Sequence, residues 1–520
     1  MEHLFTYNSE SAVVETEQGK VRGYVYDNIS IFKGIPYAKA ERFHAPRPVE
    51  PWQGILDATS YGFVCPLLDV SSRPNGELLV PHRYWIMNED CQNLNLWTPA
   101  CDEGKRPVLV WLHGGGFEAG SAIEQEAYDG ENMSRFGDVV VVSVNHRLNV
   151  LGYCDLSAFG EEYINSGNAG TDDIIAALRW VRGNISRFGG NPDNVTIFGQ
   201  SGGGAKVTTL LQTPAADGLY AKGINMSGVI GDLVADEEGS GEELVYAMIE
   251  ELGIKHVKEL EKVPYQVLAD AYKKVQPVLK KQGKYVGGKP HPNVCYLGKP
   301  GKNEFRPETA QIPLMVGTVF GEFLSFREPA YNKNKMTAKE GEEMVRQRLG
   351  DEAAEELLPL FAKAYPMRHP IDLMTLDYTF RLPTQRYIRK RSALNNCTYS
   401  YLFNLDMPLD GGRTPWHCSD IPYMFHNTEM IPVTQEAGVT EKLEAQIFES
   451  VMAFVRTGNP NHTALPDWPA STPEEEHTMV FDRQTKLCTN HDVELIPMYA
   501  GYIETILEQE MTEIMRNVQH

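Results

Sequence analysis

A serine in the middle of the chain lies in a pattern that can make it a nucleophile. Residues 199–203 read Gly-Gln-Ser-Gly-Gly, with Ser201 at the centre, and they lie between a β-branched apolar run (195–198) and a helix-prone run (205–211). A sharp turn from strand to helix projects a serine hydroxyl towards a base, and small neighbours let the two elements close around it. The context therefore predicts a nucleophile elbow at Ser201.

A second glycine-rich segment precedes the elbow and follows the apolar run 108–112. Residues 113–117 read His-Gly-Gly-Gly-Phe. Consecutive glycines leave backbone N–H groups free to converge on one point, as the oxyanion of an acyl-transfer intermediate requires. We expect Gly115 and Gly116 to donate to that oxyanion together with Gly202, which follows the nucleophile.

The nucleophile needs a base, which in enzymes with such an elbow comes last in the chain order serine, acid, histidine. His417 follows the strand-like run 399–403 at loop distance and is the preferred candidate. His426 and His369 compete with it. His426 directly follows an apolar run, where a packed histidine is the simpler interpretation, and His369 lies in a turn flanked by arginine and proline.

The acid should follow a strand that lies between the elbow and the base. Glu322 is the first carboxylate after the apolar run 314–318. Such a residue would orient the imidazole and stabilise its charged form. A glutamate at a strand end can also be a solvated surface charge, so the residues alone leave both interpretations open.

Buried strands and crossover helices must position these residues. Continuous apolar runs predict strands buried on both faces of a mostly parallel sheet, at 108–112, 139–144, 196–198, 314–316 and 399–403. Helical spacing of Ile174, Leu178, Val181 and Ile185 predicts a crossover helix before the elbow. We therefore expect one large α/β domain over residues 1–520. Residues 233–300 form a predicted helical insertion, either a cap over the site or a packed helical layer.

Composition limits the partners. The 520 residues carry a formal charge of −22, which argues against nucleic acid and anionic membranes as partners. Neither an apolar stretch of membrane-spanning length nor a signal peptide is visible, so we expect a cytoplasmic protein, or a secreted one if the N-terminus has been trimmed. Eight cysteines without a C-x-x-C pair predict no zinc site. Cys65 and Cys91 bracket an irregular segment that a disulfide would close in an oxidising compartment.

These segments together resemble the type-B carboxylesterases, which are cholinesterase-like α/β hydrolases. The resemblance covers nearly the whole chain, through residues 32–38, 89–95, 113–117, 184–192, 199–203 and 457–461. The family's G-T-x-x-D-E-G and H-G-x-D-x-P-Y loops match residues 317–323 and 417–423. The resemblance implies an α/β-hydrolase fold with helical insertions that form a cap or gorge. It also implies a triad of Ser201, Glu322 and His417.

The same resemblance implies supporting residues around the triad. Ser227 and Gln200 are expected beside it, and Phe117, Tyr84 and Trp85 along a gorge whose entrance loop the Cys65–Cys91 pair would close. No metal or organic cofactor is implied. The chain departs from the family's pattern where Gln200 replaces glutamate, Gly202 replaces alanine and Cys418 replaces glycine, and where Gly321 and Phe323 flank the acid.

The expected function is hydrolysis of small to medium apolar or aromatic carboxylic esters through an acyl-enzyme. The expected partner is a small ester, and the expected assembly is a monomer or a homodimer. Two alternatives stay open. One is an esterase specialised for aromatic, hydroxycinnamoyl-type esters, and the other is a catalytically inactive cholinesterase-like binding protein.

Overall fold

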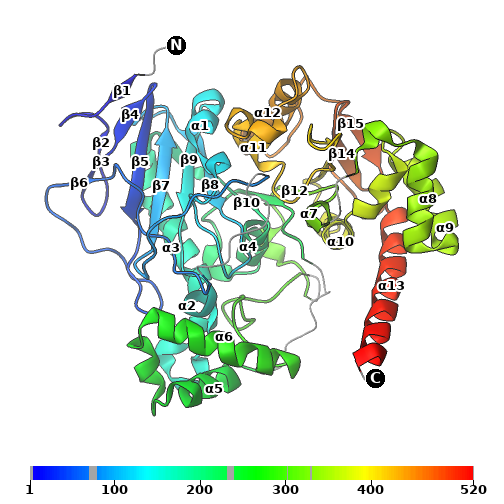
Figure 1. Ribbon diagram of the computed structural model, residues 1–520. Helices are drawn as coiled ribbons and strands as arrows, with labels where there is room; N and C mark the ends of the chain where they lie inside the picture. The colour runs from blue at the N-terminus through cyan, green and yellow to red at the C-terminus, as the bar shows by residue number, and fades with distance from the viewer. Residues whose placement is uncertain (1–3, 70–78, 231–238, 301–302, 328–330, 519–520) are drawn as a thin grey trace.

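A long twisted sheet runs through the molecule, and helices pack on both of its faces (Figure 1). The computed structural model describes residues 4–69, 79–230, 239–300, 303–327 and 331–518. Its strands are β1 (Phe5–Thr6), β2 (Val13–Glu15), β3 (Lys20–Arg22), β4 (Tyr24–Tyr26), β5 (Ile29–Pro36), β6 (Ile55–Asp57), β7 (Asn93–Thr98), β8 (Arg106–Leu112), β9 (Val140–Val144), β10 (Gly190–Gln200), β11 (Lys222–Met226), β12 (Leu314–Val319), β13 (Thr398–Phe403), β14 (His477–Phe481) and β15 (Lys486–Thr489).

The order of the strands shows a parallel centre with antiparallel edges. The main sheet has 12 strands in the order β1-β4-β5-β7-β9-β8-β10-β11-β12-β13-β14-β15, and β2, β3 and β6 form a small second sheet. From β9 to β14 every neighbouring pair is parallel, whereas the pairs from β1 to β9 and the pair β14–β15 are antiparallel. Parallel strands are covered on both faces, which explains why every residue of β9 is buried.

The helices connect these strands and cover the sheet. They are α1 (Glu131–Gly137), α2 (Asn149–Tyr153), α3 (Ala169–Asn184), α4 (Gly202–Leu211), α5 (Glu242–Leu252), α6 (Tyr265–Lys281), α7 (Leu324–Arg327), α8 (Ala338–Leu349), α9 (Asp351–Ala364), α10 (Arg381–Ser392), α11 (Ile421–Phe425), α12 (Thr440–Thr457) and α13 (Leu495–Val518). None of the helices in the described ranges has the length and apolar content needed to cross a membrane.

The predicted α/β architecture is confirmed. The five apolar runs lie in β8, β9, β10, β12 and β13, and the crossover helix before the elbow is α3. Ile185 lies one residue beyond α3, in a short 3₁₀ turn. Because β8, β10, β12 and β13 are parallel neighbours in one sheet, the loops after them emerge at the same edge. That edge receives the predicted triad residues Ser201, Glu322 and His417 and the glycine loop 114–116.

The predicted helical insertion contains α5 and α6, which lie side by side below the sheet (Figure 1). Their apolar stripe is buried in a cluster with Leu148, Leu151 and Tyr163, through Leu244, Met248 and Leu268. Residues 233–238 lie outside the described part of the chain. The insertion therefore has a core-packing role, and its role as a cap stays a prediction.

Candidate active site

The turn between β10 and α4 has the strained backbone of a nucleophile elbow. Ser201 adopts φ 57° and ψ −123°, a conformation that side chains disfavour, and its N–H donates to the Met226 carbonyl at 2.8 Å. A Cβ on Gly203 would lie 1.9 Å from the Leu112 carbonyl oxygen, so strand and helix approach closely only because that residue is glycine. Ser201 is half-buried, and its turn is held between the Met226 carbonyl and the end of β8 at Leu112.

The glycine loop after β8 lies directly against this turn. Gly115 and Gly116 have φ values of 82° and 66°, which glycine adopts without strain. A Cβ on Gly202 would lie 2.1 Å from the carbonyl oxygen of Gly116 and 2.4 Å from its nitrogen. The structure thus brings together the three residues that the sequence predicts as oxyanion donors.

This close approach makes Gly202→Ala informative, because alanine is the residue that the resembled family usually has there. The added methyl group has to push the 114–116 loop away from the turn. We expect turnover of esters to fall about 10²-fold, the typical cost of losing one oxyanion donor. Steady-state kinetics, together with a thermal melt to confirm folding, checks this. Unchanged turnover would contradict the assigned position of the loop.

Glu322 and His417 meet at the ends of β12 and β13. Glu322 is fully buried, and its Oε2 accepts a hydrogen bond from His417 Nδ1. Its Oε1 accepts from the Ser227 hydroxyl at 2.6 Å and from the Val319 N–H at 2.8 Å. Because a carboxylate only accepts, Nδ1 carries a proton, and the neutral imidazole has its lone pair on Nε2. The predicted acid, base and supporting Ser227 therefore form one hydrogen-bonded unit.

The Nε2 side of the imidazole faces residue 200. The Gln200 amide nitrogen lies 3.1 Å from His417 Nε2, and the Gln200 Oε1 accepts from the Cys418 thiol at 3.3 Å. Among the described residues, no hydrogen bond joins the Ser201 hydroxyl to His417. Gln200, predicted only as a neighbour of the triad, is thus in direct contact with the candidate base.

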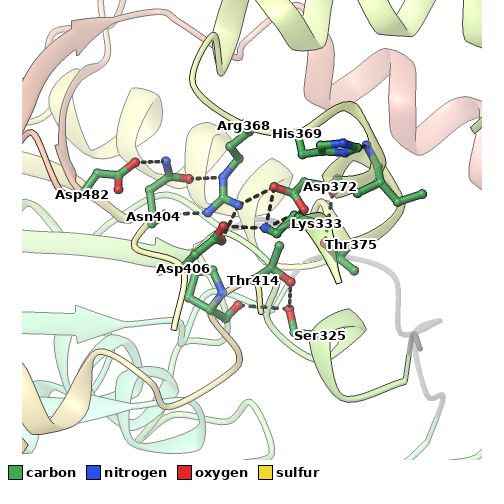
Figure 2. Close-up of polar contacts among 12 residues, drawn as sticks. Ser325, Lys333, Arg368, His369, Asp372, Thr375, Asn404, Asp406, Thr414 and Asp482 are labelled. Carbon is green, nitrogen blue, oxygen red and sulfur yellow. Dashed lines mark hydrogen bonds and ion pairs between the residues drawn. The ribbon is translucent and has the colours of Figure 1, made fainter. Parts of the chain in front are cut away.

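Several bonds tie the loop of Glu322 to the loop of His417. The Ser325 and Thr414 hydroxyls lie 2.7 Å apart (Figure 2), and Ser325 also donates to the Pro415 carbonyl at 3.1 Å. The His417 N–H donates to the Glu322 carbonyl at 3.2 Å. Gly321 adds an N–H bond to the Pro415 carbonyl at 3.1 Å. These bonds fix the spacing of acid and base.

A buried ion-pair network packs against the loops of Glu322 and His417. Figure 2 shows the Arg368 guanidinium between Asp372 and Asp406, at 2.9 and 2.8 Å, with Lys333 bonded to both carboxylates. The guanidinium also lies 3.7 Å from the ring centroid of Phe320, which begins the turn to Glu322. The network therefore braces the acid loop.

Two phenylalanines flank the imidazole. Phe323 stacks on His417 with ring centroids 4.2 Å apart, and Phe380 lies 5.1 Å away. Phe323 is 44% exposed, so it forms an accessible apolar wall beside the base. No motif in the sequence singles out Phe380, which directly precedes α10. Of the predicted gorge residues, Phe117 packs edge-on against Tyr153, while Tyr84 and Trp85 are exposed.

Cys65 and Cys91, which a disulfide would join in an oxidising compartment, are not bridged in this structure. Both residues are free, buried thiols that contact one another. A hydrogen bond with Cys65, together with burial, holds the pKa of the Cys91 thiol well above its ordinary value. The Leu148 N–H also donates to the Cys65 sulfur, at 3.2 Å. Cys91 thus packs as a protonated thiol against Cys65.

The competing histidines lie in other environments. His426 has its Nδ1 3.4 Å from Glu444 and stacks on Phe136, while His369 accepts a bond from the Ile371 N–H at the start of a short helix. A lysine that the sequence analysis missed lies closer to the site. Lys206, buried on α4, donates to the His113 carbonyl at 2.9 Å, and burial lowers its pKa to about 7.

Asp420 should make stability depend on pH. Burial, with a smaller contribution from the nearby Glu322 charge, raises its pKa to about 7 even though a bond from the Tyr401 hydroxyl at 2.8 Å lowers it. The folded protein therefore holds a proton that the unfolded chain releases near pH 4, so the unfolding free energy falls as pH rises from about 4 to 7.

We expect the unfolding free energy of Asp420→Asn not to fall in this way as pH rises. The difference in unfolding free energy between the variant and wild type should grow in favour of the variant by about 2–4 kcal/mol from about pH 4 to pH 8, because one pKa unit corresponds to about 1.4 kcal/mol. Urea unfolding of both proteins at the two pH values measures the difference. Parallel pH profiles would show that Asp420 is ionised in the folded state.

The chain is similar to known proteins over nearly its whole length. The model of the Carboxylesterase family matches residues 10–496. The chain is 33% identical over 483 residues to the para-nitrobenzyl esterase of Bacillus subtilis (strain 168), covering 91% of this chain and 95% of that protein. It is 30% identical to the phenmedipham hydrolase of Pseudarthrobacter oxydans, covering 90% and 94%. A solved esterase from anaerobic Clostridium hathewayi that can hydrolyse aliphatic aromatic polyesters superposes with a TM-score of 0.93 and 50% identity, covering 96% and 100%.

Proposed function

Because this chain belongs to the carboxylesterase family and is an enzyme that cleaves carboxylic esters, we propose that cleavage proceeds through Ser201, His417 and Glu322 and an acyl-enzyme. The observation that carries the proposal is the buried Glu322–His417 hydrogen bond, located at the same sheet edge as the strained Ser201 turn. The presence of the three triad residues and of the oxyanion glycines at one sheet edge supports an enzyme over the alternative of an inactive binding protein.

The proposed reaction has two halves. The Ser201 oxygen bonds to the ester carbonyl carbon while His417 Nε2 takes its proton, and the N–H groups of Gly115, Gly116 and Gly202 bind the resulting oxyanion. The carbon–oxygen bond to the alcohol then breaks, and the alcohol takes the proton from Nε2. A water molecule repeats these steps on the acyl-enzyme, which releases the acid and restores the serine.

Aromatic rings beside the base support small to medium apolar or aromatic esters as substrates. Phe323 and Phe380 lie along the imidazole, where an acyl or alcohol group would rest during attack. An aromatic group would gain offset or edge-on ring contacts there. The half-exposed Phe323 also supports the narrower candidate, an esterase for hydroxycinnamoyl-type esters. The C. hathewayi relative makes aliphatic aromatic polyesters a further class to test.

A panel of esters tests the proposal. The wild-type protein should hydrolyse p-nitrophenyl esters, with a chain-length optimum that sizes the acyl site, and a phosphonylating inhibitor should label the peptide that contains Ser201. Methyl hydroxycinnamates compared with short aliphatic methyl esters separate the two substrate classes. Hydrolysis without labelling of that peptide would refute Ser201 as the nucleophile. Equal or better turnover of the aliphatic esters would refute the narrower candidate.

A further inference from the structure

The side chain of Gln200 occupies the face of His417 that has to accept the serine proton. Glu322 holds the Nδ1 proton, so Nε2 carries the lone pair, and an amide nitrogen can only donate. The 3.1 Å contact is therefore an N–H···N bond from Gln200 to the candidate base. Gln200 is fully buried, and its Oε1 lies beside Gly114 of the oxyanion loop.

Cys418 sets the orientation of that amide. With Oε1 towards Cys418, the thiol donates to an oxygen at 3.3 Å and the amide nitrogen donates to Nε2, whereas the reverse orientation would set the amide oxygen against the Nε2 lone pair. Burial raises the pKa of the Cys418 thiol well above its ordinary value, which keeps the donor proton in place at neutral pH. The result is a directed chain of hydrogen bonds from thiol to amide to imidazole.

We propose that Gln200, oriented by the Cys418 thiol, is a positioning residue that binds the Nε2 lone pair of His417 in the free enzyme and disfavours the imidazolium. The inference rests on the proposed function of His417 as the base. Protonation of Nε2 would place an N–H against the amide N–H, so this arrangement opposes the charged ring. Before proton transfer, Nε2 must exchange its bond with Gln200 for one with the Ser201 hydroxyl.

Other titratable groups also face this ring. Glu322 bonds to Nδ1, Asp420 begins α11 beside it, and Cys418 follows it in the chain. Asp377, at the start of α10, and Glu124, after the oxyanion loop, act through Glu322 and Cys418 respectively. A substitution at position 200 leaves all of them in place, so a change in the pH profile reports on residue 200.

Two substitutions of Gln200 by side chains of similar size test whether its amide donates to His417 Nε2. In Gln200→Glu a carboxylate accepts from Nε2–H and favours the imidazolium, while in Gln200→Met the side chain neither donates nor accepts. The midpoint of the acidic limb of the kcat/KM profile should rise in the order wild type, Met, Glu. We expect at least about one pH unit between the first and the last, a tenfold change in the protonation equilibrium. Gln282→Glu, on an exposed residue after α6, is the control for the added charge and should keep the wild-type midpoint.

Two substitutions of Cys418 test whether its thiol orients the Gln200 amide. Cys418→Ser keeps a donor to Oε1 and should keep the wild-type midpoint. Cys418→Ala removes the donor, so the Gln200 amide can turn and offer its oxygen to Nε2–H, and the midpoint should rise as in Gln200→Glu. A role in packing alone would give the serine and alanine variants the same midpoint, which would overturn the proposal.

A measurement without turnover separates this inference from the proposed function. The Ser201→Ala background carries Gln, Met or Glu at position 200, and the ¹³Cε1 resonance of His417 is titrated in each of these proteins. The resonance is assigned by its loss in a His417→Ala variant. The same order of midpoints is expected as in the kinetic profiles. If Ser201 and His417 prove essential but the midpoints coincide, the inference is wrong and the proposed function stands. If Ser201→Ala keeps full activity, the proposed function itself fails.

Discussion

Ser201→Ala is expected to lower ester turnover about 10⁴- to 10⁶-fold while the protein stays folded. Removing the hydroxyl abolishes formation of the acyl-enzyme, and the oxyanion donors and binding contacts that remain give only weak acceleration over water. Folding should be kept, because the backbone bond from the residue 201 N–H to the Met226 carbonyl does not involve the side chain. Initial rates on the best p-nitrophenyl ester, with circular dichroism of both proteins, measure the effect.

Ser186→Ala is a matched control. Ser186 is an exposed serine in the short turn after α3, so its variant should retain wild-type turnover. A Ser201→Ala protein that kept more than about a hundredth of the wild-type rate would show that another group attacks the ester. Phosphonate labelling of the variant would then locate that group.

The sheet and the catalytic loops could be predicted because their signals are local. Continuous β-branched runs such as that in β9 can be satisfied only by a strand covered on both faces, and a serine or a glycine loop that directly follows such a strand must lie at its carboxyl end. The parallel order of β8, β10, β12 and β13 then brings those ends together. Family resemblance added Glu322, whose local sequence alone was ambiguous.

Other features of the site depend on contacts between distant parts of the chain. The Gln200–His417 bond joins residues 217 positions apart, and Phe380 reaches the imidazole from a helix whose start carries no motif. Lys206 reads as an ordinary helical lysine until its burial against the His113 carbonyl is seen. Cys65 and Cys91 lie in contact as free thiols, and a disulfide between them in an oxidising compartment stays a prediction, since spacing in the sequence sets no redox state.

Glu322→Gln should lower kcat about 10⁴-fold, although it changes only one oxygen to nitrogen. The Ser227 hydroxyl and the Val319 N–H both donate to Oε1, so the amide of the variant keeps its oxygen there and turns its NH₂ towards His417 Nδ1. Nδ1 must then accept, which moves the ring proton to Nε2. In that tautomer the ring cannot take the serine proton, the failure known for an acid-to-amide change in a triad. The Nε2 proton would also point at the Gln200 amide, which adds a clash between donors.

A second glutamate–histidine pair in the same protein gives the control for this variant. Glu444 lies 3.4 Å from His426 Nδ1 and accepts from the Thr428 N–H, so Glu444→Gln makes the same chemical change away from Ser201. It should leave kcat unchanged and alter at most the melting temperature. If Glu322→Gln lost no more activity than Glu444→Gln, Glu322 would be a structural carboxylate. Loss in Glu322→Gln alone, with kcat falling and KM nearly constant, would instead show that the acid acts in the transition state by fixing the tautomer of the base.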